Sequence, residues 1–151
     1  MALKVGGKAP ELKLTDEAGK SFKLSSLKGK TVVLYFYPKA DTPGCTTESC
    51  EFRDHSAAFA GKDAVIIGIS PDTEKAQTKF KNKFTLPFTL LADADHAGAE
   101  AYGVWGEKSM YGKTYMGVMR TTFVIGPDGK IKHIFEKVKP AGHAEEVLAV
   151  I

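Results

Sequence analysis

Apolar residues occur along the chain in short runs that polar turns separate. The first long run, TVVLYFY (31–37), places β-branched and aromatic residues next to one another with no polar residue after Thr31 except the tyrosine hydroxyls. A strand that is apolar on both faces is typical of the centre of a sheet covered on both sides. AVIIGIS (64–70) has the same character, and Leu90-Leu91-Ala92 predicts a third, shorter strand.

Helical spacing follows the first of these strands. Cys45, Phe52 and Phe59 recur at intervals of seven, which indicates one face of a helix. Thr42 is a suitable N-cap, and Pro43 suits the first helical position because it lacks an N–H that would have no partner there. The pattern therefore predicts a helix that begins at Thr42-Pro43 and carries Cys45 in its first turn.

Further helices and turns complete the order of elements. We expect Ser70-Pro71-Asp72 to open a second helix, 97–102 to form a short one, and the tail GHAEEVLAVI (142–151) to form a closing helix. The polar turn 16–20 separates two extended segments and predicts an N-terminal hairpin. A second hairpin is expected from TTFVI (121–125), the turn 126–129 and KIKHIFE (130–136), whereas 103–119, rich in Gly, Tyr and Met, is interpreted as a loop.

The order strand–helix–strand–helix, then a hairpin and a helix, predicts the fold class. It is typical of a thioredoxin-like α/β fold, with a central mixed β-sheet flanked by helices and, here, an N-terminal β-hairpin. The chain has 151 residues and neither an internal repeat nor a low-complexity linker. We therefore expect residues 1–151 to form a single domain.

Composition and charge exclude several classes of function. The net charge is only +3 and the lysines are scattered among acids, so no concentrated basic stripe for nucleic acid is present. No apolar stretch approaches the roughly 20 residues needed to cross a bilayer, and the N-terminus lacks the apolar run of a secretory signal. We expect a cytoplasmic protein that binds neither nucleic acid nor membrane.

The two cysteines, Cys45 and Cys50, are candidates for chemistry. A bond between residues so close in sequence closes too small a loop to staple a fold. At a helix N-terminus, unpaired N–H groups and the helix dipole favour an anion, and hence the thiolate form of Cys45. The Thr42 hydroxyl could bond that sulfur or a substrate oxygen. From local features alone, a buried core cysteine behind a capped helix remains an equal alternative.

Cys50 changes this balance. Five residues on, it lies about 140° around the helix from Cys45 and thus off the core-facing stripe. We therefore expect it near the surface. An exposed free thiol in a cytoplasmic protein is a liability unless it is used, so the pair indicates an attacking and a resolving cysteine.

Pro38, Thr42 and Cys45 fit the Pro-x-x-x-Thr-x-x-Cys signature of the peroxiredoxins, which the chain therefore resembles. The Cys50 spacing and the run KSMYGKTYMGVMRTTFVIGPDGKI (108–131) are similar to the bacterioferritin-comigratory, or Q-type, subfamily. The likeness covers nearly the whole chain.

The resemblance implies roles for individual residues. Cys45 would attack the peroxide and become a sulfenic acid, and Cys50 would resolve it as an intramolecular disulfide. Thr42 would hydrogen-bond thiolate and peroxide, Pro38 would shield the site from water, and Arg120 would close over the thiolate. Arg120 taken alone would be read as a surface ion pair at the start of a strand.

Two weaker candidates stay open. Glu48, three residues after Cys45, could bond Arg120 and help to hold substrate, or be a solvated helix acid. The residues Trp105, Met110, Tyr111, Tyr115, Met116 and Met119 could form an apolar collar or a docking surface for a reductant, although ordinary loop packing is the simpler interpretation.

The resemblance also implies substrates and partners. These are hydrogen peroxide and organic hydroperoxides, with electrons from thioredoxin or a similar dithiol protein, in an enzyme that is often a monomer. No cofactor is expected, because the sequence has no dinucleotide or phosphate-loop motif and its histidines have no metal-site spacing.

Two other functions for the cysteine pair fit the sequence less well. A thiol–disulfide oxidoreductase on the same fold usually separates its cysteines by two residues, which is closer than the spacing here. A zinc site built from Cys45, Cys50 and a histidine lacks both the usual ligand spacing and an evident fourth ligand.

Overall fold

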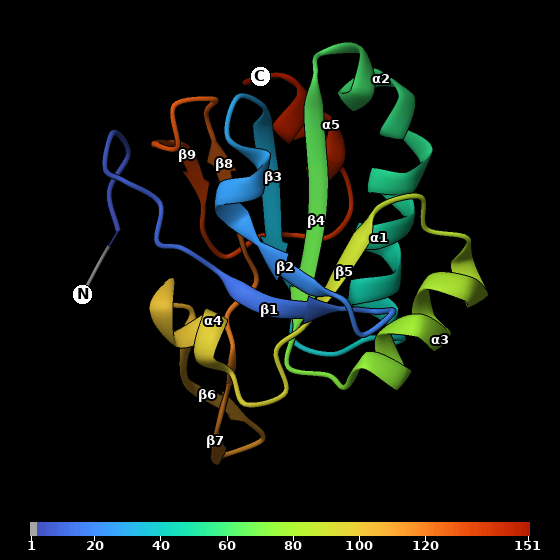
Figure 1. The fold of residues 1–151 in the computed structure, drawn as a ribbon. Helices are drawn as coiled ribbons and strands as arrows, with labels where there is room; N and C mark the ends of the chain where they lie inside the picture. Colours follow the sequence, from blue (N-terminus) through green and yellow to red (C-terminus); the bar gives the residue numbers. More distant parts are fainter. Residues whose placement is uncertain (1–2) are drawn as a thin grey trace.

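A seven-stranded mixed sheet forms the centre of the molecule, with helices on both of its faces (Figure 1). The computed structural model describes residues 3–151. The spatial order of the strands is β2-β1-β5-β4-β3-β8-β9. Their bounds are β1 (Lys13–Asp16), β2 (Ser21–Lys23), β3 (Thr31–Phe36), β4 (Ala64–Ser70), β5 (Thr89–Ala92), β8 (Thr121–Ile125) and β9 (Ile131–Phe135). The predicted central mixed sheet and N-terminal hairpin are confirmed.

β3 lies at the centre of this sheet. It runs parallel to β4 and antiparallel to β8, and both faces are covered. Leu34 and Phe36 pack into one apolar cluster, whereas Val33 and Tyr35 pack into the cluster on the opposite face. The uninterrupted apolar run in the sequence is thus explained, because neither face of β3 meets water.

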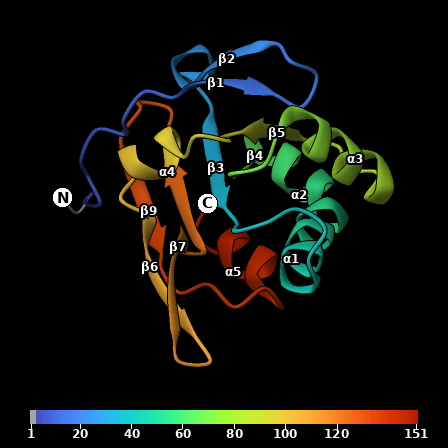
Figure 2. The same cartoon turned by 90° about the horizontal axis from the view of Figure 1, so that it is seen from below.

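The helices divide between the two faces of the sheet, and Figure 2 shows this division from below. One cluster is covered by α1 (Pro43–Asp54), α2 (Ser56–Gly61), α3 (Glu74–Phe84) and α5 (His143–Leu148). The other is covered by the 3-10 helix η1 (Leu24–Leu27), α4 (Ala97–Ala101) and the chain that precedes β1.

The helix with the cysteines begins as predicted. Thr42 is the N-cap in extended backbone conformation, and Pro43 is the first helical residue. The helix is interrupted at His55, so the seven-residue spacing spans two helices, α1 and α2. Cys45, Phe52 and Phe59 are nevertheless all fully buried in one cluster.

The second helix begins later than predicted. Thr73, not the 70–72 segment, is the N-cap of α3, and its side chain accepts a hydrogen bond from Ala76 N at 3.2 Å. Ser70 and Asp72 are instead occupied with each other, because the Ser70 hydroxyl donates to Asp72 Oδ2 at 2.6 Å.

The prediction of a loop over 103–119 is wrong. This segment forms a two-stranded hairpin of β6 (Trp105–Met110) and β7 (Lys113–Val118) that extends away from the main sheet (Figure 1). Most side chains described in β7 are exposed, so the strand carries no apolar alternation that would reveal it. The turn residues Tyr111 and Gly112 both have positive φ, as a tight two-residue hairpin turn requires, but tyrosine is an unusual residue there.

The packing of Tyr35 against β4 yields a stability prediction. A Cβ on Gly68 would lie 2.8 Å from the Tyr35 hydroxyl and 2.8 Å from Leu90 Cδ2. We expect Gly68→Ala to lower the free energy of unfolding by about 1–3 kcal/mol through overpacking. Gly61→Ala is the matched control, because nothing lies within 4 Å of its added Cβ, and it should be neutral or slightly stabilising. Urea denaturation measures both, and equal midpoints would contradict the prediction.

Candidate active site

The site lies where β3 ends and the chain crosses to α1. The connecting segment 37–42 is held at several points. Ala40 N donates to Asp72 Oδ2 at 2.8 Å, and Lys83 pairs with Asp41 at 2.9 Å. The position of the first turn of α1 is therefore fixed from the neighbouring strand β4 and helix α3 as well as from β3.

Cys45 lies in that first turn and is fully buried. The first backbone bond into the helix runs from Thr46 N to Thr42 O at 2.8 Å. The N–H groups of Gly44 and Cys45 precede it and have no acceptor in the described part of the chain. These free donors, together with the helix dipole, favour negative charge at Cys45 Sγ.

Arg120 reaches Cys45 because of the strand register. Phe36, the last residue of β3, pairs with Thr121, the first residue of β8. Arg120 therefore lies just beyond the end of β3, on the side where α1 begins. Its Nη2 donates to Cys45 Sγ at 3.2 Å, which closes a contact between residues 75 positions apart.

Glu48 holds the other side of the same guanidinium. Arg120 Nη1 donates to Glu48 Oε1 at 2.7 Å, and the Glu48 side chain has no exposed surface. The predicted bond between Glu48 and Arg120 is confirmed, and the solvated-acid alternative is wrong. The second carboxylate oxygen, Oε2, is buried without a hydrogen-bond partner.

Charges and burial shift the acid–base properties of this pair. Burial raises the pKa of Glu48 to about 7, although Arg120 acts in the opposite direction. Burial lowers the pKa of Arg120, but Glu48 and Cys45 together outweigh it and raise the pKa above its ordinary value. Arg120 therefore stays a cation at every relevant pH.

Two contributors to this site were missed by the sequence reasoning. A Cβ on Gly44 would lie 3.2 Å from Arg120 Nη2, so glycine leaves room for the guanidinium. Lys108, on the hairpin, donates from Nζ to Val118 O at 3.0 Å, and burial followed by the charge of Arg120 lowers its pKa. A lone glycine after proline and a lysine in an apparent loop carry no local signal of either role.

Thr42 and Pro38 are near the site by position, with a difference for Thr42. The expected bond from its hydroxyl to Cys45 Sγ is not formed, because the hydroxyl donates to Lys39 O at 2.8 Å. A hydroxyl has one proton but two lone pairs, so Thr42 Oγ1 can still accept a bond from a substrate O–H. Pro38 is half-buried, two residues after the end of β3.

Cys50 lies on the same continuous helix as Cys45, and both cysteines are free. It lies off the fully buried face of the helix, as the spacing indicated, but is half-buried rather than exposed; burial raises the pKa of its thiol, with Arg53 acting against this. On an intact helix, residues five apart have Cα atoms roughly 8.7 Å apart. A disulfide requires them within about 7 Å.

The apolar residues of the hairpin do not close over Cys45 as a single collar. Tyr111 is 97% exposed, and Tyr115, Met116 and Met119 are also exposed. Trp105 instead stacks on His96, with ring centroids 3.9 Å apart. The side chain of Met110 lies outside the described residues.

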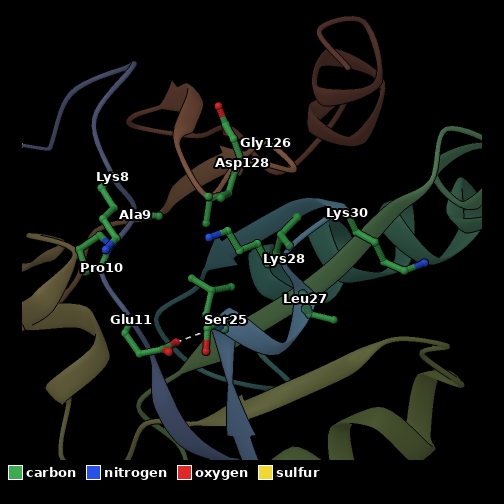
Figure 3. A pocket seen from close by; sticks show the side chains of 14 residues that line it. Lys8, Ala9, Pro10, Glu11, Ser25, Leu27, Lys28, Lys30, Gly126 and Asp128 are labelled. Atoms are coloured by element: carbon green, nitrogen blue, oxygen red, sulfur yellow. Dashed lines mark hydrogen bonds between the residues drawn. The ribbon is translucent and has the colours of Figure 1, made fainter.

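A separate cavity of about 480 Å³ lies at the far end of the sheet from Cys45 (Figure 3). Val32, near the start of β3, and Ile125, at the end of β8, line it together with Lys8 and Lys28. Glu11 in its wall is bonded to Ser25 N at 2.9 Å. Neither Cys45 nor Arg120 lines it, so it is separate from the thiol site.

The described part of the chain offers neither a cluster of metal ligands nor a membrane-spanning helix. Over residues 3–151, no three or more His, Cys, Asp and Glu side chains gather closely enough to hold a metal ion. No helix among them has the length and apolar character needed to span a bilayer.

Comparisons with known proteins agree with the resemblance. Residues 5–134 match the model of the AhpC/TSA family. Peroxiredoxin Bcp of Bacillus subtilis is 50% identical over 151 residues, which cover 100% of this chain and 96% of the relative. Peroxiredoxin Bcp of Escherichia coli is 44% identical over 97% of this chain and 94% of its own.

Solved structures give the same result and confirm the thioredoxin-like fold. PrxQ of Xylella fastidiosa superposes with a TM-score of 0.93 at 35% identity, covering 99% of this chain and 95% of that one. The bacterioferritin comigratory protein of Xanthomonas campestris, studied for its alkyl peroxide reduction activity, has a TM-score of 0.87 at 40% identity, covering 91% and 88%. The chain thus belongs to the AhpC/TSA family, in the bacterioferritin-comigratory (Q-type) branch of the peroxiredoxins, and is a thiol-dependent peroxidase.

Proposed function

We propose that Cys45 is the peroxidatic cysteine. Its thiolate attacks the terminal oxygen of a hydroperoxide, the O–O bond breaks, and the sulfur becomes a sulfenic acid. The observation that carries this assignment is the 3.2 Å bond from Arg120 Nη2 to Cys45 Sγ at a helix N-terminus. A fixed cation and free N–H groups stabilise the thiolate and remain in place for the charge that moves onto the departing oxygen.

The remaining residues of the site have supporting roles in this proposal. Arg120 keeps its charge and its planar fork of donors in a site with little water, where such donors are strongest. Thr42 Oγ1 accepts a hydrogen bond from the peroxide O–H, while its own hydroxyl continues to donate to Lys39 O. Pro38, two residues after the end of β3, shields the sulfur from solvent. Glu48 orients the guanidinium through the 2.7 Å bond to Nη1.

Cys50 then resolves the sulfenic acid. Its thiol displaces the sulfenic oxygen as water and leaves a disulfide with Cys45. Because the two Cα atoms are too far apart on an intact helix, at least the turn 46–50 must unwind first. This explains how two free cysteines on one helix can act in sequence rather than bond at once.

The disulfide requires an external reductant, and the family implies a thiol. We propose a dithiol protein of the thioredoxin type as the reductant and hydrogen peroxide together with organic hydroperoxides as the substrates. The enzyme is proposed to act as a monomer of one domain, since both cysteines come from one chain. A cytoplasmic location remains a prediction, as does docking of a reductant on the exposed side chains of the β6–β7 hairpin.

The role of Cys45 is tested by Cys45→Ser. Serine keeps the size of the side chain but is not ionised near neutral pH, so we expect peroxide turnover to be lost while the far-UV circular dichroism stays the same. Turnover is followed by peroxide consumption with a thioredoxin system. Retention of substantial activity in this variant would contradict the assignment.

The role of Arg120 is tested by two substitutions, one that removes only its fork of donors and one that also removes its charge. Arg120→Lys keeps the charge but loses the fork, so the single-turnover rate of Cys45 oxidation should fall moderately. Arg120→Met should reduce the rate by about 10²–10³-fold, as expected for loss of one charge-stabilising donor. Arg53→Met is the control, because Arg53 bonds Asp54 and Phe84 O and not Cys45. If Arg120→Met reacts at the wild-type rate, Arg120 has no part in the reaction.

The unwinding step is tested by oxidation with one equivalent of peroxide. We expect the wild-type protein to lose helical circular dichroism and to exchange the amides of 46–50 faster. Cys50→Ser should keep its helix and over-oxidise more readily at Cys45, because no local thiol intercepts the sulfenic acid. An oxidised wild-type protein with an intact helix and a titratable Cys50 thiol would exclude Cys50 as the resolving cysteine.

A further inference from the structure

One buried polar atom at the site has no partner. Glu48 Oε2 is inaccessible to solvent and makes no hydrogen bond, while Oε1 of the same carboxyl accepts from Arg120. A buried anionic oxygen without a donor is costly, whereas a buried carboxylic acid is much less so. The site therefore favours a proton on this carboxyl, and the free oxygen is the place for it.

The charges around Glu48 lead to the same conclusion. The groups that act on it are Arg120 from the β8 side and Glu51 on its own helix; Tyr35 of β3 is near it, and Cys45 is linked to it through Arg120. Tyr35 stays neutral, since burial raises its pKa well above the ordinary value. Arg120 is the cation bonded to both Cys45 and Glu48, and these two acids compete to neutralise it. One ionised acid balances Arg120, and two would leave an uncompensated buried charge.

This competition links the two protonation states. When Cys45 is a thiolate, Glu48 is favoured as the neutral acid. When sulfur loses its charge on becoming a sulfenic acid, Glu48 is free to ionise against Arg120. Burial and Glu51 raise the pKa of Glu48 and Arg120 lowers it, with a net value of about 7, so the proton can be exchanged near neutral pH.

We propose that Glu48 is a catalytic proton relay, which delivers a proton from Oε2 to the leaving oxygen of the peroxide and later recovers one from the Cys45 thiol. The proposal rests on the peroxidatic role of Cys45 argued above. It assigns Glu48 a chemical step beyond holding Arg120 in place.

The step balances in atoms and charge. The Cys45 thiolate donates an electron pair to the terminal oxygen, the S–O bond forms, and the O–O bond breaks. Its electron pair goes to the departing oxygen, which takes the Glu48 proton and leaves as water or an alcohol. Cys50 then forms the disulfide with release of water. After a dithiol has reduced this disulfide, the Cys45 thiol returns its proton to the Glu48 carboxylate.

Other groups near the site are already committed. Arg120 stays protonated, and the Lys108 Nζ donates to Val118 O. His143 lies beyond the site, with Nε2 bonded to Thr122 Oγ1 at 2.7 Å and Nδ1 to Glu146 at 2.8 Å. Within the described site, Glu48 combines a titration near neutral pH with an unused oxygen.

The test compares two oxidants in Glu48→Gln, which keeps an oxygen for Arg120 but cannot carry the proton. Hydrogen peroxide leaves a strongly basic oxygen that must be protonated, whereas peracetic acid leaves acetate, which needs no proton. Below neutral pH, single-turnover oxidation of Cys45 by hydrogen peroxide should slow by about 10²–10⁴-fold, the usual contribution of a general acid. Oxidation by peracetic acid should slow far less.

Three controls separate the possible outcomes. Glu145→Gln, which removes an exposed acid 3.8 Å from His55 Nε2 and not a group that acts on Glu48, should keep the wild-type ratio of the two rates. Glu48→Asp, which retains a carboxylic proton, should restore much of that ratio. Equal slowing with both oxidants in Glu48→Gln would overturn the relay and leave Glu48 as a positioning residue. Persistence of turnover in Cys45→Ser would instead overturn the proposed function itself.

The proton on Glu48 has a second readout in the stability of the reduced protein. A carboxyl with a pKa raised on folding favours the folded state while it is protonated, and this contribution falls as pH rises from the unfolded value through about 7. Between pH 5 and pH 8, the melting temperature of the wild type should therefore fall relative to that of Glu48→Gln. Parallel melting curves across this range would mean that Glu48 carries no exchangeable proton there and would also overturn the relay.

Discussion

The Arg120 guanidinium, bonded to Cys45 and Glu48, is the interaction on which the site depends. It joins the first turns of α1 to the start of β8, across 75 residues of sequence. Neither Cys45 nor Glu48 alone would suffice to hold the guanidinium, because a buried cation needs several acceptors to replace its lost hydration. The contact also explains Gly44, since a larger residue would meet the guanidinium. A cysteine that would otherwise be a small core residue is thereby given a cation and two free N–H groups.

In the proposed mechanism, the helix that presents Cys45 has to satisfy two opposing requirements. It must hold the sulfur against Arg120 for the attack, yet release the turn 46–50 before the disulfide can form. Tertiary contacts of that turn set the cost of release. Ser49 is hydrogen-bonded to the buried Tyr35 hydroxyl at 2.8 Å, and Glu51, just beyond it, accepts from Gly142 N at 2.7 Å. Unwinding leaves the Tyr35 hydroxyl without its partner, which favours return of the helix once the disulfide is reduced.

The electrostatics of this centre serve reactivity more than stability. Burying Glu48 beside Arg120 leaves one carboxyl oxygen unpaired, which a purely structural ion pair would avoid. Such an arrangement is reasonable where charge has to move during the reaction, because one cation can then balance the thiolate first and the carboxylate afterwards. The unpaired oxygen and the thiolate are thus parts of one charge balance around Arg120.

Much of the fold could be derived from local sequence. The runs 31–37 and 64–70 have apolar residues on both faces, which is the pattern of central strands. The helix start at Thr42-Pro43 follows from capping chemistry. The hairpin of β6 and β7 could not be predicted in this way, because its strands project from the sheet and have no buried face to impose a period of two.

The residues of the candidate site can likewise be separated into those that local sequence identifies and those that only the tertiary structure identifies. Cys45 and Cys50 could be selected from their places on one helix, since helix geometry is local and fixes both the dipole at Cys45 and the separation of the two thiols. Arg120 could be named only through family resemblance, and Gly44 and Lys108 not at all. Their roles depend on the antiparallel register of β3 and β8 and on the hairpin that precedes it, which bring together side chains distant in sequence. The sequence alone thus determined that two thiols lie on one helix, with Cys45 at its N-terminus, and the tertiary structure decided which cation and which acid are bonded at Cys45.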